Sequence, residues 1–471
     1  MSVLAPAIQT VQSVQPVEVT GRVVSLKGLT VLVQDLPLPV GSLVMLPRLA
    51  ARVPRGGGGG EAESDSFAVS EALPGEVVGF SGQHTIVMML GQTTGIRLGD
   101  EVVGLHAAQT VGVGWSLMGR VIDGLGRAID GGGALLHTVP RPVDPPPVPA
   151  TRRLRIHSPL PTGVRAVDLM TTVGRGQRLG IFAGPGVGKS TLLGTIAKNT
   201  AADVVVLALI GERGREVQDF LQGVLGEEGR KRAVVIASTS DESPLMRIRA
   251  AQVASTVAEY FREQGRHVLL MMDSVTRYAQ AQRQIGLSIG EPPASKGYTP
   301  SVFSGMARLL ERAGQFVAER PGHEPGSVTG LYTVLVEGDD MTEPIADAAR
   351  GILDGHIMLS RALAQKGHYP AIDVLDSISR VADEVCDAAH VGARRALVKM
   401  LAAYRESEDL IQIGAYARGS NPETDAAIEF VPRINEILRQ GSGDRVVFQQ
   451  SRDLAVRLAG EIAQRLQMRR G

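Results

Sequence analysis

Cysteine is nearly absent from this sequence, with Cys386 the only one among 471 residues. A single cysteine forms neither an internal disulfide bond nor a multi-cysteine metal site, and this scarcity fits a protein that folds in a reducing compartment. The nine histidines show no paired spacing on a helix that would indicate a zinc site. The sequence thus excludes a disulfide scaffold and gives no sign of a zinc protein.

Excess charge and long apolar runs are missing as well. Lysine plus arginine and aspartate plus glutamate number 49 each, so the overall charge gives no reason to expect a nucleic-acid or membrane partner. No apolar run reaches the ~18 residues that a membrane-spanning helix needs. The first residues lack the basic start and the continuous apolar stretch of a signal peptide, so we expect a cytoplasmic protein.

The length and the pattern of the first part predict several domains. A chain of 471 residues is expected to form about three domains. Residues 1–20 are predicted to be a flexible leader, because Pro6 and Pro16 interrupt any long helix. Residues 21–107 contain short β-rich runs divided by turn residues, which predict a small closed β-barrel. The polar, glycine-rich segment 56–66 has too little apolar surface to be buried, so it is predicted to be a surface loop.

The remainder of the chain alternates strands and helices and then becomes helical. Within residues 108–380, strands are expected at 178–182, 203–210, 232–238, 267–272 and 329–336. Such alternation predicts an α/β domain whose parallel sheet is covered by helices on both faces. Residues 381–471 have a helical pattern, which predicts a third, C-terminal helical domain.

One strand-to-helix turn carries the clearest chemistry in the chain. It comprises Ala183, Gly184, Pro185, Gly186, Val187, Gly188, Lys189 and Ser190, with Thr191 next in the helix. Small residues allow successive backbone N–H groups to curl round an anion, and the positive end of the new helix points at it. Lys189 adds a full charge for the β- and γ-phosphates of a nucleotide, and Ser190 offers a hydroxyl to Mg²⁺. Ala183 stands where the usual motif has its first glycine, which is tolerated where no positive φ is needed.

Two further strands end in charged residues. One apolar run ends at Asp273, where a carboxylate can support Mg²⁺ through water. Another ends near Glu212, a carboxylate that can orient the attacking water while Arg213 approaches the γ-phosphate; a solvated strand end explains this pair equally well. Arg277 lies one helical turn past Asp273, where it can face the phosphates or form a surface ion pair.

A later segment supplies an aromatic ring and an arginine. Tyr369, held in front of Pro370, can stack on adenine, and Arg380 can act as a finger on the nucleotide of a neighbouring subunit. The residues alone are equally compatible with a core or hinge role for Tyr369 and with a surface charge at Arg380.

Together these motifs resemble the catalytic-subunit family of rotary ATPases, which includes the β subunits of ATP synthases and the ATPases of flagellar and type III protein export. The resemblance covers nearly the whole chain from residue 21. It rests on the phosphate loop and on the segments 211–216, 273–278 and 377–380. Within the family, the segments 290–303 and 337–340 look most like those of the flagellar export enzymes.

The resemblance implies a hexamer of RecA-like P-loop NTPase domains, crowned by the barrel domains, with nucleotide sites at the subunit boundaries. ATP and Mg²⁺ would be the ligands. Lys189 would bind the β- and γ-phosphates, and Ser190 would ligate Mg²⁺. Asp273 would support the metal, and Glu212 would polarise the attacking water.

The remaining positions carry over in the same way. Arg213 and Arg277 would contact the γ-phosphate within one subunit. Tyr369 would stack on adenine, and Arg380 would reach into the site of the next subunit. The loop of residues 291–300 would face a central pore that holds a stalk protein, and the C-terminal helices would meet export substrates and chaperones.

The function that the resemblance implies is an ATPase that powers the delivery or unfolding of flagellar subunits for export. Its further partners would be the membrane proteins of the export gate, and it would lie at the inner face of the cytoplasmic membrane. The flagellar enzymes dock a negative regulator, similar to a stator, on an amphipathic leader helix. Residues 1–20 do not have that pattern, and the glycine run at 56–60 also departs from the family.

Other functions compete with this one. A virulence type III secretion ATPase and an ATP synthase catalytic subunit would share the chemistry. A hexameric RNA translocase shares the core but needs aromatic platforms and a basic groove, whereas residues 21–105 hold only Phe67 and Phe80 as aromatics. A non-catalytic nucleotide-binding subunit should lack the water-activating carboxylate that Glu212 supplies. We therefore expect no nucleic-acid partner and favour the export ATPase.

Overall fold

The computed structural model describes residues 19–48, 70–106, 109–318, 324–336, 338 and 340–467. The glycine-rich segment 56–66 and residues 1–18 of the predicted leader lie outside this part. The chain divides into two compact units, of which the first contains Met1–Thr110 with Glu242–Met246 and Gln284–Pro292, and the second contains the remainder. Because the second unit holds both the central sheet and the C-terminal helices, the domain boundary at residue 380 stays a prediction.

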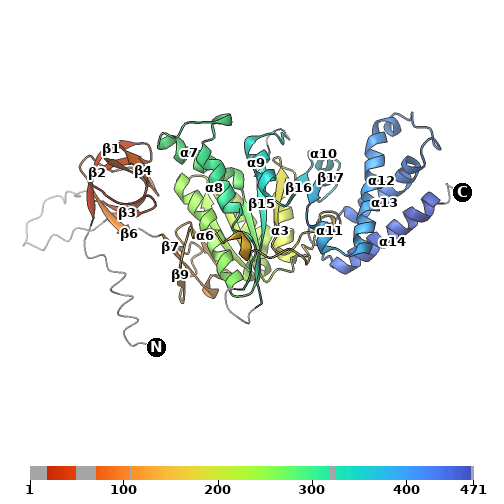
Figure 1. The fold of residues 1–471 in the computed structure, drawn as a ribbon, viewed down its shortest axis with the longest axis horizontal. Helices are drawn as coiled ribbons and strands as arrows, with labels where there is room; N and C mark the ends of the chain where they lie inside the picture. Colours follow the sequence, from red (N-terminus) through yellow and green to blue (C-terminus); the bar gives the residue numbers. More distant parts are fainter. Residues whose placement is uncertain are drawn as a thin grey trace, which may run out of the picture. The chain divides into compact units, whose positions relative to one another are not determined.

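The first unit is built on a closed β-barrel (Figure 1). Its strands are β1 (Thr20–Lys27), β2 (Thr30–Gln34), β3 (Leu43–Arg48), β4 (Ser70–Ser81), β5 (His84–Met89) and β6 (Glu101–His106). They pair in the order β1-β2-β5-β4-β3-β6, and antiparallel pairing of β1 with β6 closes the ring. Alternate side chains point inward, so that Val31 and Val33 of β2 are fully buried. The predicted barrel is confirmed.

The second unit is built on a sheet that contains nine of the described strands. They are β8 (Val121–Ile122), β10 (Arg178–Ala183), β11 (Val204–Glu212), β12 (Ala233–Thr239), β13 (His267–Asp273), β14 (Gly314–Gln315), β15 (Ser327–Leu335), β16 (Gly355–Leu359) and β17 (Ile372–Ser379). The order is β17-β16-β10-β15-β13-β11-β12-β8, with β14 beside β15. Neighbours are parallel except for β14 with β15 and β16 with β17. Separately, β7 (Thr110–Val113) pairs with β9 (Val139–Pro142).

The five predicted strands correspond to β10, β11, β12, β13 and β15, whose residues are buried almost throughout. Strands buried on both faces read as continuous apolar runs, which explains why the sequence revealed them. β16 and β17 were not predicted. β16 is short and alternates in burial, and β17 is a half-exposed edge strand that carries Asp373 and Asp376.

Helices cover the sheet, as predicted for an α/β domain. They are α2 (Arg165–Met170), α3 (Lys189–Asn199), α4 (Gly214–Asp219), α5 (Gly226–Lys231), α6 (Pro244–Glu263), α7 (Val275–Ser288), α8 (Pro300–Leu310), α9 (Pro344–Ile352), α10 (Arg361–Gln365) and α11 (Ala382–Val385). In Figure 1, α6 and α8 lie on one side of β15 and α3 lies on the other. None of the helices in the described residues is both long and apolar enough to cross a bilayer.

Three further helices follow, α12 (Ala388–Gln412), α13 (Pro422–Leu438) and α14 (Phe448–Gln467). They pack on one another and against α2. Their buried side chains, among them Leu397, Phe430 and Leu458, belong to the same hydrophobic cluster as Leu192 and Leu193 of α3. The C-terminal helices therefore extend the core of the sheet instead of enclosing a separate one.

Candidate active site

The phosphate loop leaves β10, a strand that lies between β15 and β16. Gly186 and Gly188 have φ angles of 77° and 91°, which residues with a side chain rarely adopt. Ala183 has no positive φ, which explains why alanine replaces the usual glycine there. α3 begins at Lys189 without a side-chain cap on its first N–H groups. These donors are free for an anion, and the positive helix end favours one.

Lys189 lies among carboxylates from two other strands. Its Nζ forms an ion pair with Asp273 at the end of β13, and it lies 3.7 Å from Oε1 of Glu212 at the end of β11. Asp273 also accepts a 2.7 Å hydrogen bond from Oγ1 of Thr333 on β15. Lys189, Asp273 and Glu212 therefore meet at the carboxyl edge of the parallel sheet, where ligands of such sheets bind.

Glu212 has the electrostatics of a base. The pKa of its carboxyl group is raised to about 7, chiefly by burial and then by the charge of Asp273, with a smaller contribution from Glu216, while the charge of Lys189 opposes the rise. Its side chain is only 16% exposed. A carboxylate with a pKa near neutrality takes up and releases protons at physiological pH, which is what a general base requires.

The two candidate arginines next to Glu212 are placed differently. Arg277 on α7 packs against Gly211, where an added Cβ would lie 3.0 Å from the Cβ of Arg277. Its Nη1 donates to Gln280, and its buried Nε has no hydrogen-bond partner in the described part of the chain. Arg213 is 82% exposed and lies 3.6 Å from Glu216. Arg277 is therefore held beside the end of β11, whereas Arg213 points into solvent.

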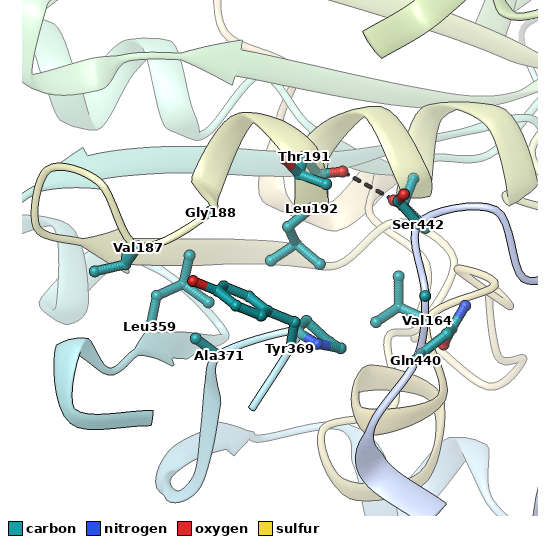
Figure 2. Close-up of a pocket in the computed structure, with 13 residues that line it drawn as sticks. Val164, Val187, Gly188, Thr191, Leu192, Leu359, Tyr369, Ala371, Gln440 and Ser442 are labelled. Atoms are coloured by element: carbon teal, nitrogen blue, oxygen red, sulfur yellow. Dashed lines mark hydrogen bonds between the residues drawn. The ribbon is translucent and has the colours of Figure 1, made fainter. Parts of the chain in front are cut away.

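A cavity of about 350 Å³ lies beside the first turn of α3. Its lining includes Val164, Val187, Leu359 and Tyr369, so most of it is apolar (Figure 2). The Tyr369 ring packs against the phosphate loop, 3.6 Å from where a Cβ on Gly188 would lie. Tyr369 is 48% exposed although its ring lines the cavity, so part of the residue is accessible to a ligand there. This geometry suits an aromatic base whose phosphates extend toward Lys189.

Gln440, Gly441 and Ser442 complete the cavity from the loop that follows α13. Figure 2 shows Ser442 pointing toward Thr191 of α3. We did not predict these residues from the sequence, because nothing in a glutamine followed by turn residues separates them from an ordinary interhelical loop.

Ser190 and Arg380 complete the set of predicted site residues. Ser190 is exposed at the start of α3. Arg380 directly follows β17, and its backbone N–H donates to the carbonyl of Asp354. Its exposed side chain forms no ion pair or hydrogen bond with the described residues, and it does not line the cavity. Within one chain, Arg380 therefore stands apart from the other residues of the site.

Comparison with known proteins decides the family. The model of the ATP synthase alpha/beta family, nucleotide-binding domain, matches residues 163–379, and that of the T3SS EscN ATPase C-terminal domain matches residues 386–454. A flagellum-specific ATP synthase of Pseudomonas aeruginosa is 49% identical over 447 residues, which are 95% of this chain and 94% of the relative. The chain belongs to the ATP synthase alpha/beta family. As a member of this family, it is an ATPase that uses ATP.

Within the ATP synthase alpha/beta family, the chain is similar to export enzymes of both flagella and virulence systems. A type 3 secretion system ATPase of Xanthomonas euvesicatoria is 47% identical over 379 residues, or 80% of this chain and 84% of the relative. One solved structure is the assembled ATPase EscN in complex with its central stalk EscO, from enteropathogenic E. coli. It has a TM-score of 0.80 at 38% identity and covers 93% of this chain and 100% of its own.

The oxygen donors near the phosphate loop suit Mg²⁺ that arrives with a nucleotide. Mg²⁺ in such sites takes one or two protein oxygens and keeps several waters. Ser190 offers an exposed hydroxyl, and Asp273 offers a carboxylate at a strand end. Across the described residues, no group of three or more His, Cys, Asp or Glu side chains is arranged to hold a metal ion. The donor set therefore fits Mg²⁺ bound mainly through phosphate and water.

Proposed function

We propose that this chain is the subunit of a homo-hexameric motor that hydrolyses Mg-ATP to power flagellar protein export. The observation that carries the proposal is the carboxylate of Glu212, 3.7 Å from Lys189 and with a pKa raised to about 7. A non-catalytic nucleotide-binding subunit has no need of such a group. The flagellar assignment is supported by the flagellum-specific relative, which matches this chain over 94% of its own length.

The chain's own groups divide the work of hydrolysis among them. Lys189 and the N–H groups of the loop bind the β- and γ-phosphates. Glu212 accepts a proton from water as the water oxygen bonds to the γ-phosphorus, and the bond from that phosphorus to the β,γ-bridging oxygen breaks toward ADP. Arg277 offsets the negative charge that develops on the γ-phosphoryl group. Ser190 and Asp273 would hold Mg²⁺, which would supply positive charge to the phosphate oxygens.

The assembly would complete the site. EscN is an assembled ATPase with a central stalk, and we infer a similar ring and stalk for this chain. In that ring Arg380 serves the nucleotide of the next subunit, which agrees with its exposed side chain. Residues 291–300 face the stalk, while the C-terminal helices meet export substrates and chaperones. The ring works at the inner face of the cytoplasmic membrane, against the membrane proteins of the export gate.

Deletion of the gene from its own host, followed by complementation, tests this proposal. Wild-type protein and the matched control Glu227→Gln should restore swimming and the export of filament subunits, because Glu227 is an exposed glutamate of α5 that pairs with Lys231. Glu212→Gln should be produced at the same level and restore neither. If the deletion strain swims normally but loses secretion of virulence effectors, the virulence enzyme is the correct assignment.

A further inference from the structure

Gln440 connects the two walls of the cavity beside the phosphate loop. Its side-chain Nε2 donates a 2.9 Å hydrogen bond to the carbonyl of Gly163, and its Oε1 accepts a 2.8 Å hydrogen bond from the N–H of Arg165. Its backbone N–H donates a 2.9 Å hydrogen bond to the carbonyl of Tyr369. The residue is 9% exposed, so these hydrogen bonds form away from bulk water.

The residues bonded to Gln440 either line the cavity or lie next in the chain to a residue that does. Val164 follows Gly163, whose carbonyl accepts from the Gln440 side chain, and precedes Arg165, whose N–H donates to it. Val164 lines one wall and is 1% exposed. Tyr369, which receives the backbone bond, lines the other wall, as Figure 2 shows. Gln440 therefore joins the two walls, with its side-chain amide bonded on the Val164 side and its backbone N–H bonded to Tyr369.

We propose that Gln440 is a positioning residue for the nucleotide base. Through its hydrogen bonds it fixes the width of the slot between Val164 and Tyr369. The proposal rests on the proposed function, in which the ring of Tyr369 stacks on adenine. The side chain of Gln440 is fully engaged with backbone groups, whereas the triphosphate is bound by the loop and Lys189. Loss of the amide should therefore weaken binding of the adenosine part and leave binding of the phosphates unchanged.

The wall that carries Val164 has other anchors, so loss of the amide should change its placement relative to Tyr369 and not its fold. Asp168 accepts hydrogen bonds from the N–H groups of Thr162 and Gly163, at 2.8 and 3.1 Å, and holds that turn without Gln440. Nη1 of Arg165 donates to the carbonyl of Ile437, which keeps α2 attached to α13. A variant at position 440 should therefore fold, with its two walls intact but no longer held at one spacing.

The test compares two ligands on the full-length protein. Gln440→Met has a similar length and no hydrogen-bonding group, and it should bind ATP about tenfold more weakly, the size expected when two modest hydrogen bonds are lost. Its affinity for inorganic tripolyphosphate should stay within about twofold of wild type, because the phosphate groups meet no altered atom. In hydrolysis assays KM should rise while kcat is retained. Gln449→Ala, at an exposed α14 glutamine that contacts Asp453, is the matched control and should change nothing.

A second variant and a double mutant keep the proposal open to refutation. Gln440→Asn keeps the carbonyl and NH₂ groups of the amide but is too short to reach both Gly163 and Arg165, so it should show the same loss of ATP affinity. It provides the measurement if Gln440→Met yields little folded protein. Tyr369→Ala combined with Gln440→Met should be less than additive in ATP affinity, since both act on the same slot. Additive effects, or an equal loss of ATP and tripolyphosphate binding, would overturn the proposal. If Tyr369→Ala weakens ATP binding but neither Gln440 variant does, this inference fails while the proposed function stands. If Tyr369→Ala has no effect, the adenine assignment itself fails.

Discussion

The ammonium of Lys189 lies 3.7 Å from the carboxylate of Glu212, although two strands separate β10 from β11 in the sheet. The phosphate loop carries Lys189 over the edge of β15 and β13, so that it reaches the last residue of β11. Asp273, at the end of β13, shares the same ammonium. The group proposed to bind phosphate and the group proposed to activate water are thus already adjacent in a single chain.

Lys189→Ala and Glu212→Gln should fail in different ways. Lys189→Ala should lose both ATP binding and turnover, because it removes the charge that holds the phosphates. Glu212→Gln should keep Mg-ATP affinity within a few-fold but lose about 10²-fold or more in kcat, the scale of a general base. Binding by calorimetry and steady-state phosphate release measure the two quantities. Near-normal hydrolysis by Glu212→Gln would remove that residue from the mechanism.

The raised pKa of Glu212 predicts a pH dependence of activity. Only the carboxylate accepts a proton from water, so kcat/KM for ATP should fall about tenfold per pH unit below pH 7 and level off above it. Burial is the main cause of the rise, and the charge of Asp273 adds to it. Glu212→Gln controls for the ionisation of ATP itself and should lack this fall in activity below pH 7, whereas Glu227→Gln, an exposed change on α5, should retain it. An unchanged profile in Glu212→Gln would assign the fall to another group.

Substitutions at Tyr369 should separate the ring from its hydroxyl. Tyr369→Ala should weaken ATP binding by ~1–3 kcal/mol, the range measured for stacking on bases elsewhere. Tyr369→Phe should change it little, because the ring face provides the contact. Fluorescent-nucleotide titration of both variants gives the comparison. Equal losses would indicate a hydrogen bond from the hydroxyl, and no loss in either would return Tyr369 to a structural role.

Arg380 should act in trans, which makes hydrolysis a property of the ring. Arg380→Ala should bind ATP normally and lose ~10³-fold or more in turnover, the value of an arginine finger, whereas an exposed ion pair contributes under ~1 kcal/mol. Wild-type specific activity should rise steeply with protein concentration as rings form.

The decisive experiment mixes two inactive variants. Rings of Arg380→Ala and Lys189→Ala subunits contain some interfaces with an intact phosphate loop and an intact Arg380, so partial activity should return. Arg395→Ala is a suitable control, because Arg395 is an exposed arginine that contacts Asp383. Mixed rings that form but stay inactive, or wild-type turnover by Arg380→Ala alone, contradict the assignment.

The local features of this protein could be predicted from the sequence. The phosphate loop was recognisable because its backbone needs glycine at two positions of positive φ and a lysine at the helix start. Five sheet strands were recognisable because burial on both faces demands continuous apolar runs. Asp273 and Glu212 were found because each ends such a run. Each of these features depends on residues that are adjacent in the sequence, so it can be recognised from a short stretch of the chain.

Tertiary structure alone decided how those pieces meet. The order β10-β15-β13-β11 brings Lys189, Asp273 and Glu212 together, and no local pattern encodes which strands become neighbours. Gln440 enters the cavity because the C-terminal helices share the core of the sheet, which places an ordinary interhelical loop beside Tyr369. β17 was missed because an edge strand with a half-exposed face lacks the apolar run that marks a buried one. Contacts between distant segments depend on how whole surfaces pack, and that information is spread over the chain rather than concentrated in any motif.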